Sequence, residues 1–330
     1  MKLLAILFAC ALTCSQAAIA QQEPILIRFS HVVASDTPKG KAAERFRQLA
    51  EQATGGRVRV QIYPNSQLYR DREELEALQL GAVEMIAPSL SKLGPLGARE
   101  FQVFDLPFMF PDRAALHRVT NGPIGEGMLQ RLRLKGVIGL AFWDNGFKSF
   151  SANRPLLSPA DMVGLRMRIQ PSRVLDAQMR ALGAQPMTLQ FGEVHDALEA
   201  GVVDGTENPP SNFYTQGMQE VQSHFTVSNH GYLGYAVIVN RKFWEGLPPD
   251  VRRQLEGAMR EATSYANSIA QEENDRALAA IRASGKTQVH VLTEPEREAW
   301  KKALASVGVD MEAHIGADLI SDIRRAIAAP

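Results

Sequence analysis

The sequence contains very little cysteine, because Cys10 and Cys14 are the only two in 330 residues. Both fall within residues 1–20, which we expect to be removed on export. A mature chain starting near Gln21 would have no disulfide, no thiol nucleophile and no cysteine-based metal site. Lipid attachment at Cys10 is an alternative, but it would leave a long leader without a purpose.

Residues 1–20 have the pattern of a secretory signal peptide. Lys2 supplies the positive start, Leu3 to Leu12 form an apolar run, and Ala18-Ile19-Ala20 is a small-x-small cleavage signal. The apolar run is too short for a membrane-spanning helix. We therefore expect cleavage near Ala20 and a soluble protein in the periplasm.

An excess of charge of one sign is also missing. Lysine plus arginine equals aspartate plus glutamate at 36 each, so no broad field favours nucleic acid or an anionic membrane. Any anion site must therefore be local. There is no serine nucleophile elbow, zinc motif, nucleotide loop or paired-carboxylate motif, so we expect no cofactor, no metal and no catalytic activity. An exported lyase or hydrolase with His31, His195 or His230 as its base is the alternative.

Strand-like and helix-like segments alternate in the first part of the chain. Ile25 to Phe29, Val58 to Ile62 and Val83 to Ala87 have the pattern of strands, and helices are predicted to begin at Thr37-Pro38 and at Asp71. This order predicts a mainly parallel sheet covered by helices. In such open sheets, ligands bind beyond the carboxyl ends of the strands.

The stretch from Gly164 to Gln170 alternates apolar residues with arginine and glutamine. This period of two predicts a strand with one apolar and one cationic face, which carries both Arg166 and Arg168. One interpretation is a half-exposed strand with two solvated arginines. The other is that one arginine points into a cleft as a guanidinium fork for a carboxylate.

Two further motifs follow this strand: FGEVHDALEAGVVDGTENP from Phe191 to Pro209, and SNHGYLGY from Ser228 to Tyr235. Together with GLRMRIQ they resemble the solute-binding proteins of tripartite ATP-independent periplasmic (TRAP) transporters, and most closely the DctP-type branch, which captures four-carbon dicarboxylates. The resemblance extends from about Ile25 to Leu247. It implies an α/β, two-lobed periplasmic binding protein fold with a hinge and a long helix that spans both lobes.

The resemblance also implies a set of ligand-binding residues. Arg168 would clamp a carboxylate and Arg166 would stay on the surface, although alternation alone does not separate them. Lys148 would be a second cation, Phe191 would pack against the ligand, and Asn208 would donate its amide. Further candidates lie at the return crossing between the lobes and on lobe I loops: His230, Tyr235, His31, Lys39, Ser91 and Lys92. From the residues alone, Asn208 could equally be a turn residue and each lysine a solvated surface cation.

Two crossings are expected to divide the mature chain. The first is a turn-rich break at Asp144-Asn145-Gly146, and the return lies near Asn229 to Tyr235. The expected division is a signal peptide at 1–20, lobe I at 21–145 plus 234–272, and lobe II at 146–233 plus 273–330.

A long helix is expected between Ala258 and Ser284, where there is no glycine or proline. At about 1.5 Å per residue it would span about 40 Å, more than one lobe's width. The alternatives are a surface helix of one domain, or two helices with a kink.

The function implied by the resemblance is capture of a small organic acid and its delivery to the membrane permease subunits of a TRAP transporter. We expect a C4-dicarboxylate such as malate, succinate or fumarate. The alternative ligand is a 2-oxo or aromatic monocarboxylate. Nothing in the sequence excludes a sensor kinase as an additional partner.

Overall fold

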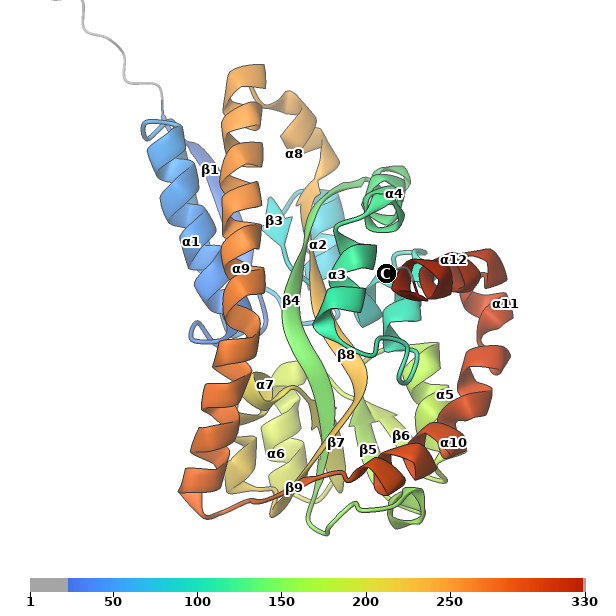
Figure 1. The fold of residues 1–330 in the computed structure, drawn as a ribbon. Helices are drawn as coiled ribbons and strands as arrows, with labels where there is room; N and C mark the ends of the chain where they lie inside the picture. Colours follow the sequence, from blue (N-terminus) through green and yellow to red (C-terminus); the bar gives the residue numbers. More distant parts are fainter. Residues whose placement is uncertain (1–22, 329–330) are drawn as a thin grey trace, which may run out of the picture.

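The structure, a computed structural model, describes residues 23–328, and the predicted signal peptide with its cleavage site near Ala20 lies outside them. The strands form one mixed, nine-stranded sheet in the order β2-β1-β3-β8-β4-β7-β5-β6, with β9 paired to β8 (Figure 1). The predicted two-lobed α/β fold is confirmed. None of the helices within residues 23–328 is both long enough and apolar enough to cross a membrane.

Lobe I is built on three parallel strands, as predicted. Thr37 caps the first helix by accepting a hydrogen bond from the Gly40 N–H at 3.1 Å, and Pro38 occupies the first turn. The elements of this lobe are β1 (Ile25–Ser30), α1 (Pro38–Ala53), β2 (Val58–Tyr63), α2 (Glu74–Leu80), β3 (Met85–Ile86), η1 (Leu90–Leu93), η2 (Arg99–Asp105), α3 (Arg113–Thr120), α4 (Pro123–Arg131), η3 (Leu132–Lys135) and α8 (Arg241–Gly246).

Lobe II is built on the parallel strands β7, β5 and β6. The predicted strand with Arg166 and Arg168 is β5, and a serine-capped helix follows it directly. Its elements are η4 (Pro159–Met162), β5 (Arg166–Ile169), α5 (Arg173–Ala181), β6 (Gln185–Thr188), η5 (Phe191–Glu193), α6 (Val194–Glu199), β7 (Gly205–Asn208), α7 (Pro210–Thr215), η6 (Met218–Glu220), β9 (Gln288–Val291) and α10 (Glu294–Asp310).

Two long antiparallel strands, β4 (Val137–Ala152) and β8 (His224–Asn240), connect the lobes. The predicted break at Asp144-Asn145-Gly146 is wrong, because β4 continues through it and only its register with β8 shifts there. Gly146 has a φ of 139°, and a Cβ at this position would lie 2.7 Å from Asn274 Nδ2. Glycine therefore lets the strand bend without ending.

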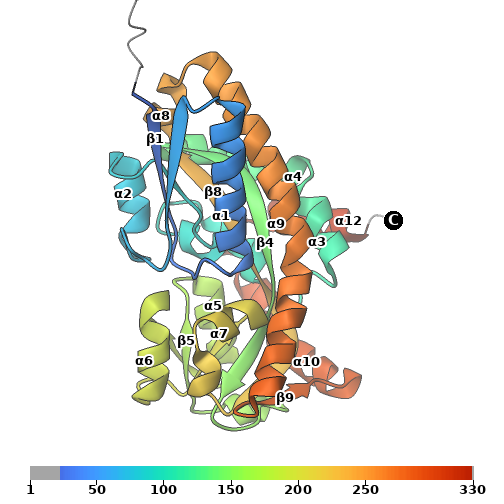
Figure 2. The ribbon, with the colours of Figure 1, turned by 90° about the vertical axis from the view of Figure 1, so that its left-hand side faces the viewer.

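The predicted long helix is a single element, α9 (Pro249–Ser284), and its 36 residues span about 54 Å. It packs against α1 of lobe I and against α7 and β9 of lobe II (Figure 2). Polar side chains tie it to β4 at the crossing. Asn267 Oδ1 accepts from the Asp144 N–H at 2.8 Å, and Asn274 Nδ2 donates to the Asn145 carbonyl.

The C-terminal segment breaks into α11 (Glu312–Ile315) and α12 (Ala317–Ala328) at Gly316, whose φ is 116°. α12 returns to lobe I and packs on α3 (Figure 1), where Arg118 donates to the carbonyls of Ala326 and Ile327. The predicted division placed this helix in lobe II. The exact residue boundaries of the lobes stay a prediction.

Candidate functional site

A small cavity of about 20 Å³ lies between the lobes, beyond the carboxyl ends of β1, β3 and β5. This is where an open parallel sheet is expected to bind a ligand. Its wall includes side chains from lobe I, from lobe II and from the connecting strand β8: Val32, Val33, Ser89 and Lys92; Arg168, Gln170, Phe191, Asn208 and Asn212; Leu233 and Tyr235.

Arg168 contributes the guanidinium in this wall, and the residue is only 1% exposed. Its Nε and Nη2 donate to the Leu189 carbonyl at 3.1 and 2.9 Å, and its guanidinium carbon lies 5.7 Å from the centre of the Phe191 ring. Burial lowers the pKa of Arg168, which the carboxylates of Asp71 and Glu207 partly oppose. No carboxylate in residues 23–328 forms a salt bridge with it, so the guanidinium has no direct anionic partner.

Two buried lysines stand on the lobe I side of the cavity. Lys92 lines it and is bonded to Asp71, with Glu74 Oε1 3.6 Å from its Nζ. Lys39 does not line the cavity but lies behind the cavity-lining Tyr235. Its Nζ donates to the Ala87 carbonyl at 3.0 Å and lies 3.9 Å from the centre of the Tyr235 ring. Within the described chain Lys39 forms no salt bridge, so a second buried cation lacks a carboxylate.

Direct hydrogen bonds join the lobes at the cavity. Ser89 Oγ of lobe I donates to Gln170 Oε1 of lobe II, and the Phe191 N–H donates to Asp71 Oδ2 at 2.5 Å. Burial would raise the pKa of Asp71, but the Lys92 ammonium and the Phe191 N–H lower it, so the carboxylate is charged. The cavity is therefore closed by polar contacts that form only when the lobes meet.

Residues 29–313 match the model of the family described as bacterial extracellular solute-binding protein, family 7 (DctP). The chain belongs to this family.

Relatives of this solute-binding protein align over nearly its whole length. The C4-dicarboxylate-binding periplasmic protein DctP of Rhodobacter capsulatus is 60% identical over 324 residues, which are 98% of this chain and 97% of that protein. A TRAP periplasmic solute-binding protein of Shewanella oneidensis with bound succinate is 42% identical, with a TM-score of 0.90, over 92% of this chain and 99% of that one. One of Pseudomonas aeruginosa PAO1 with bound L-malate is 43% identical, with a TM-score of 0.85, over 87% and 100%.

The cavity brings together five of the residues singled out from the sequence of this solute-binding protein: Arg168, Asn208, Phe191, Lys92 and Tyr235. The Tyr235 hydroxyl accepts from Asn212 Nδ2 at 3.3 Å, and Asn208 Nδ2 donates to Thr206 Oγ1 at 3.2 Å. Arg166, by contrast, pairs with Asp204 at 2.7 Å and keeps a side chain 41% exposed. Their contacts with a ligand stay predictions.

Lys148 and His230 do not line the cavity, because a buried carboxylate holds both. Lys148 Nζ lies 2.7 Å from Glu207 Oε1 and 3.8 Å from Asp105, while His230 Nε2 lies 2.8 Å from Glu207 Oε2. Burial would raise the pKa of Glu207, but Lys148 and His230 outweigh it and bring it to about 2. The ring of His230 also stacks on Phe150, with centroids 3.7 Å apart. A structural role thus accounts for both side chains.

Ser91 and His31 are also buried outside the cavity wall. Ser91 Oγ donates to Asp105 Oδ1 at 2.7 Å. Both ring nitrogens of His31 lack a hydrogen-bond partner within the described residues. Burial, aided by the charge of Lys39, lowers the pKa of His31 to about 3, so the ring is neutral near pH 7.

The sequence reasoning did not single out Ser89, Gln170 and Asn212 of the cavity wall, or Asp71, which bonds to Phe191. Gln170 carried a usable signal, because it continues the alternation of Arg166 and Arg168 on the cationic face of the strand. Asp71 and its partner Phe191 are 120 residues apart, so no local pattern connects them.

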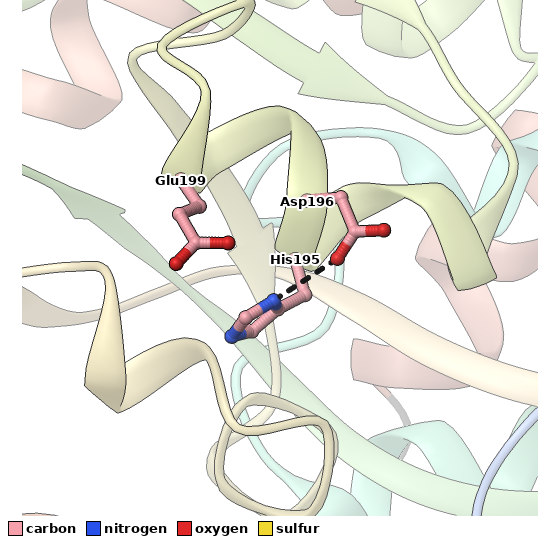
Figure 3. A group of neighbouring side chains, drawn as sticks. All are labelled: His195, Asp196 and Glu199. Atoms are coloured by element: carbon pink, nitrogen blue, oxygen red, sulfur yellow. Dashed lines mark hydrogen bonds and ion pairs between the residues drawn. The ribbon is translucent and has the colours of Figure 1, made fainter.

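One group of possible metal ligands lies elsewhere, on α6: His195, Asp196 and Glu199 (Figure 3). His195 Nδ1 lies 3.3 Å from Asp196 Oδ1, and the Asp196 side chain is 87% exposed. Both acidic residues of the group are exposed, and none of the three lines the cavity between the lobes. Such a surface cluster is common without an ion, and we assign no site to it.

The Lys148–Glu207 pair predicts a large stability effect. Lys148→Met should lower the free energy of unfolding by about 3–5 kcal/mol, because it leaves a buried carboxylate without its cation. Urea unfolding followed by circular dichroism measures this. Arg166→Ala is the matched control and should cost less than about 1 kcal/mol, because its pair with Asp204 is partly exposed.

Equal stability of the two variants would contradict this assignment.

The stability that Glu207 contributes depends on pH with a defined sign, because the pKa of Glu207 is about 2 in the folded protein and about 4.3 for an ordinary glutamate. The stabilisation is complete above the unfolded value and is lost as pH falls toward the folded one.

Proposed function

We propose that this protein is the extracytoplasmic solute-binding component of a TRAP transporter, which captures a C4-dicarboxylate and delivers it to the membrane permease. Malate, succinate and fumarate are the proposed ligands. The signal-like segment at 1–20, with cleavage near Ala20, would direct the protein to the periplasm. The observation that carries the proposal is the uncompensated guanidinium of Arg168 in the cavity.

Arg168 supports the binding of a carboxylate. Burying a charge is costly unless it is paired and hydrogen-bonded, and the Leu189 carbonyl alone does not neutralise this one. A guanidinium presents parallel N–H donors that match the two oxygens of a carboxylate. Because Leu189 and Phe191 fix the side chain in place, little conformational entropy is lost when the acid binds.

The lobe I lysines support a second carboxylate on the same ligand. Lys92 lines the cavity, and Lys39 behind it has no carboxylate partner in the described chain. A dicarboxylate held by Arg168 in lobe II would thus meet positive charge across the cavity. A monocarboxylate would leave that charge desolvated and unpaired, at a cost of about 1–3 kcal/mol.

The relatives support the same ligand class. The Rhodobacter capsulatus protein, 60% identical to this chain, is a C4-dicarboxylate-binding protein, and the two solved relatives hold succinate and L-malate. These proteins are solute-binding proteins and not enzymes, from which we infer that this chain also has no catalytic role. A sensor kinase as additional partner stays a prediction from the sequence.

Lobe closure supports delivery. The contacts Ser89–Gln170 and Asp71–Phe191 join the lobes beside the cavity, so the ligand leaves only when they break. A hinge at β4 and β8, braced by α9, allows capture and release without rebuilding the site. The permease would be the partner that favours the open form.

The first test replaces the arginines of β5. Arg168→Ala should weaken succinate binding by about 2–5 kcal/mol, because a carboxylate would lose its partner in a closed cavity. Arg168→Lys should also weaken binding, since it keeps the charge and loses the fork. Arg166→Ala is the control and should bind like the wild type. Isothermal titration calorimetry decides, and loss of binding in Arg166→Ala with full binding in Arg168→Ala would reverse the assignment.

The second test is a thermal-shift panel of dicarboxylates and monocarboxylates. At about 100-fold above its dissociation constant, a true ligand adds about 2.7 kcal/mol to stability, which corresponds to a shift of a few degrees. Malate, succinate and fumarate should raise the midpoint. The dicarboxylate proposal fails if these acids leave it unmoved while a 2-oxo or aromatic monocarboxylate raises it.

A further inference from the structure

Glu74, the first residue of α2, is a buried carboxylate beside the proposed site. It is 0% exposed, and neither carboxylate oxygen has a hydrogen-bond partner within residues 23–328. The nearest ammonium, Lys92, lies 3.6 Å from its Oε1 but is bonded to Asp71. Two carboxylates therefore share one ammonium at the lobe I side of the cavity.

The charged groups that act on Glu74 are Lys92, Asp71 and Lys39. Beyond them, Arg168 acts on Asp71 from lobe II, and neutral His31 faces Lys39. Burial raises the pKa of Glu74, and burial together with the charge of Lys92 lowers the pKa of Lys39 to about 7. Both shifts favour the uncharged forms: Lys39 gives up its proton more easily than usual, and Glu74 holds one more strongly. One proton can therefore reside on either member of this buried pair.

The charges of this cluster balance before a ligand enters. Lys39 and Lys92 offset Asp71 and Glu74 when all four are ionised, and the sum is the same when the proton of Lys39 has moved to Glu74. Lys148 offsets Glu207, which leaves Arg168 as the net charge of the site. A dicarboxylate dianion brings one negative charge more than Arg168 neutralises. In a buried site this excess is costly, and one added proton removes it. The partnerless oxygens of Glu74 can take that proton without breaking a hydrogen bond.

We propose that the site binds a dicarboxylate dianion together with one proton from solvent, that this proton leaves both Glu74 and Lys39 protonated, and that this pair thereby sets the ligand charge that the site accepts. With Glu74 neutral, Lys39 and Lys92 together exceed Asp71 by one positive charge, which matches the second carboxylate. This inference rests on the proposed function, because it needs a C4-dicarboxylate as the ligand.

Proton uptake fixes the sign of the pH dependence. Because the complex holds one proton more than the free protein, affinity must fall as pH rises, by up to about tenfold per pH unit. Carboxylic acids ionise near pH 4, so between about pH 7 and about pH 8.5 the ligand stays a dianion and the effect belongs to the protein.

Calorimetric titration of the full mature chain with succinate tests this. In phosphate and Tris buffers, whose ionisation enthalpies differ, the change in binding heat reports the protons taken up. The wild type should take up about one proton near pH 8. The double variant Lys39→Met, Glu74→Gln keeps neither titratable group of the pair and should take up about none. Glu76→Gln is the matched control, because Glu76 lies exposed on the same helix, and it should behave as the wild type.

The outcomes separate the two proposals. Succinate binding by the wild type without proton uptake overturns this inference and leaves the proposed function standing, and so does full uptake by the double variant. Absence of succinate binding by the wild type overturns the proposed function and this inference with it. The buffer comparison on the wild type is decisive by itself if the double variant does not fold.

Discussion

The buried, uncompensated charge of Arg168 is the constraint on which the rest of the site depends. A guanidinium at 1% exposure without a carboxylate is costly to the folded protein, so the surrounding structure has to hold it. The Leu189 carbonyl and the Phe191 ring fix its position, and the Phe191 N–H in turn holds Asp71 of the other lobe. Ligand capture and lobe closure are therefore parts of one contact system.

The other buried charges divide by whether they are paired. Lys148 is fully matched by Glu207, which His230 also holds, so this group braces the strands at the hinge. Lys92 is matched by Asp71, whereas Lys39 is not matched by any carboxylate in the described chain. A basic side chain without a salt bridge therefore occurs on each side of the cavity: Arg168 in its wall and Lys39 behind the wall, while the paired Lys92 lines the cavity.

The sequence predicted the elements whose signals are local. The Thr37-Pro38 start of α1, the alternation in β5 and the glycine-free run of α9 each appear in the structure. The continuity of β4 through the crossing escaped, because Asp144-Asn145-Gly146 has strong turn propensity while pairing with β8 keeps it extended. Lys148 was assigned to the ligand from the family resemblance, whereas its contact with Glu207, 59 residues away, is visible only in the fold. Local patterns therefore locate the cations, and the tertiary structure decides which of them lack a carboxylate.

The most direct measurement of the central claim is a crystal structure of the protein with succinate bound. The account predicts one succinate carboxylate paired with the Arg168 guanidinium through two parallel hydrogen bonds, and the other facing Lys92 and Lys39 of lobe I. A succinate whose carboxylates both lie away from Arg168, with the guanidinium bonded only to Leu189, would contradict it.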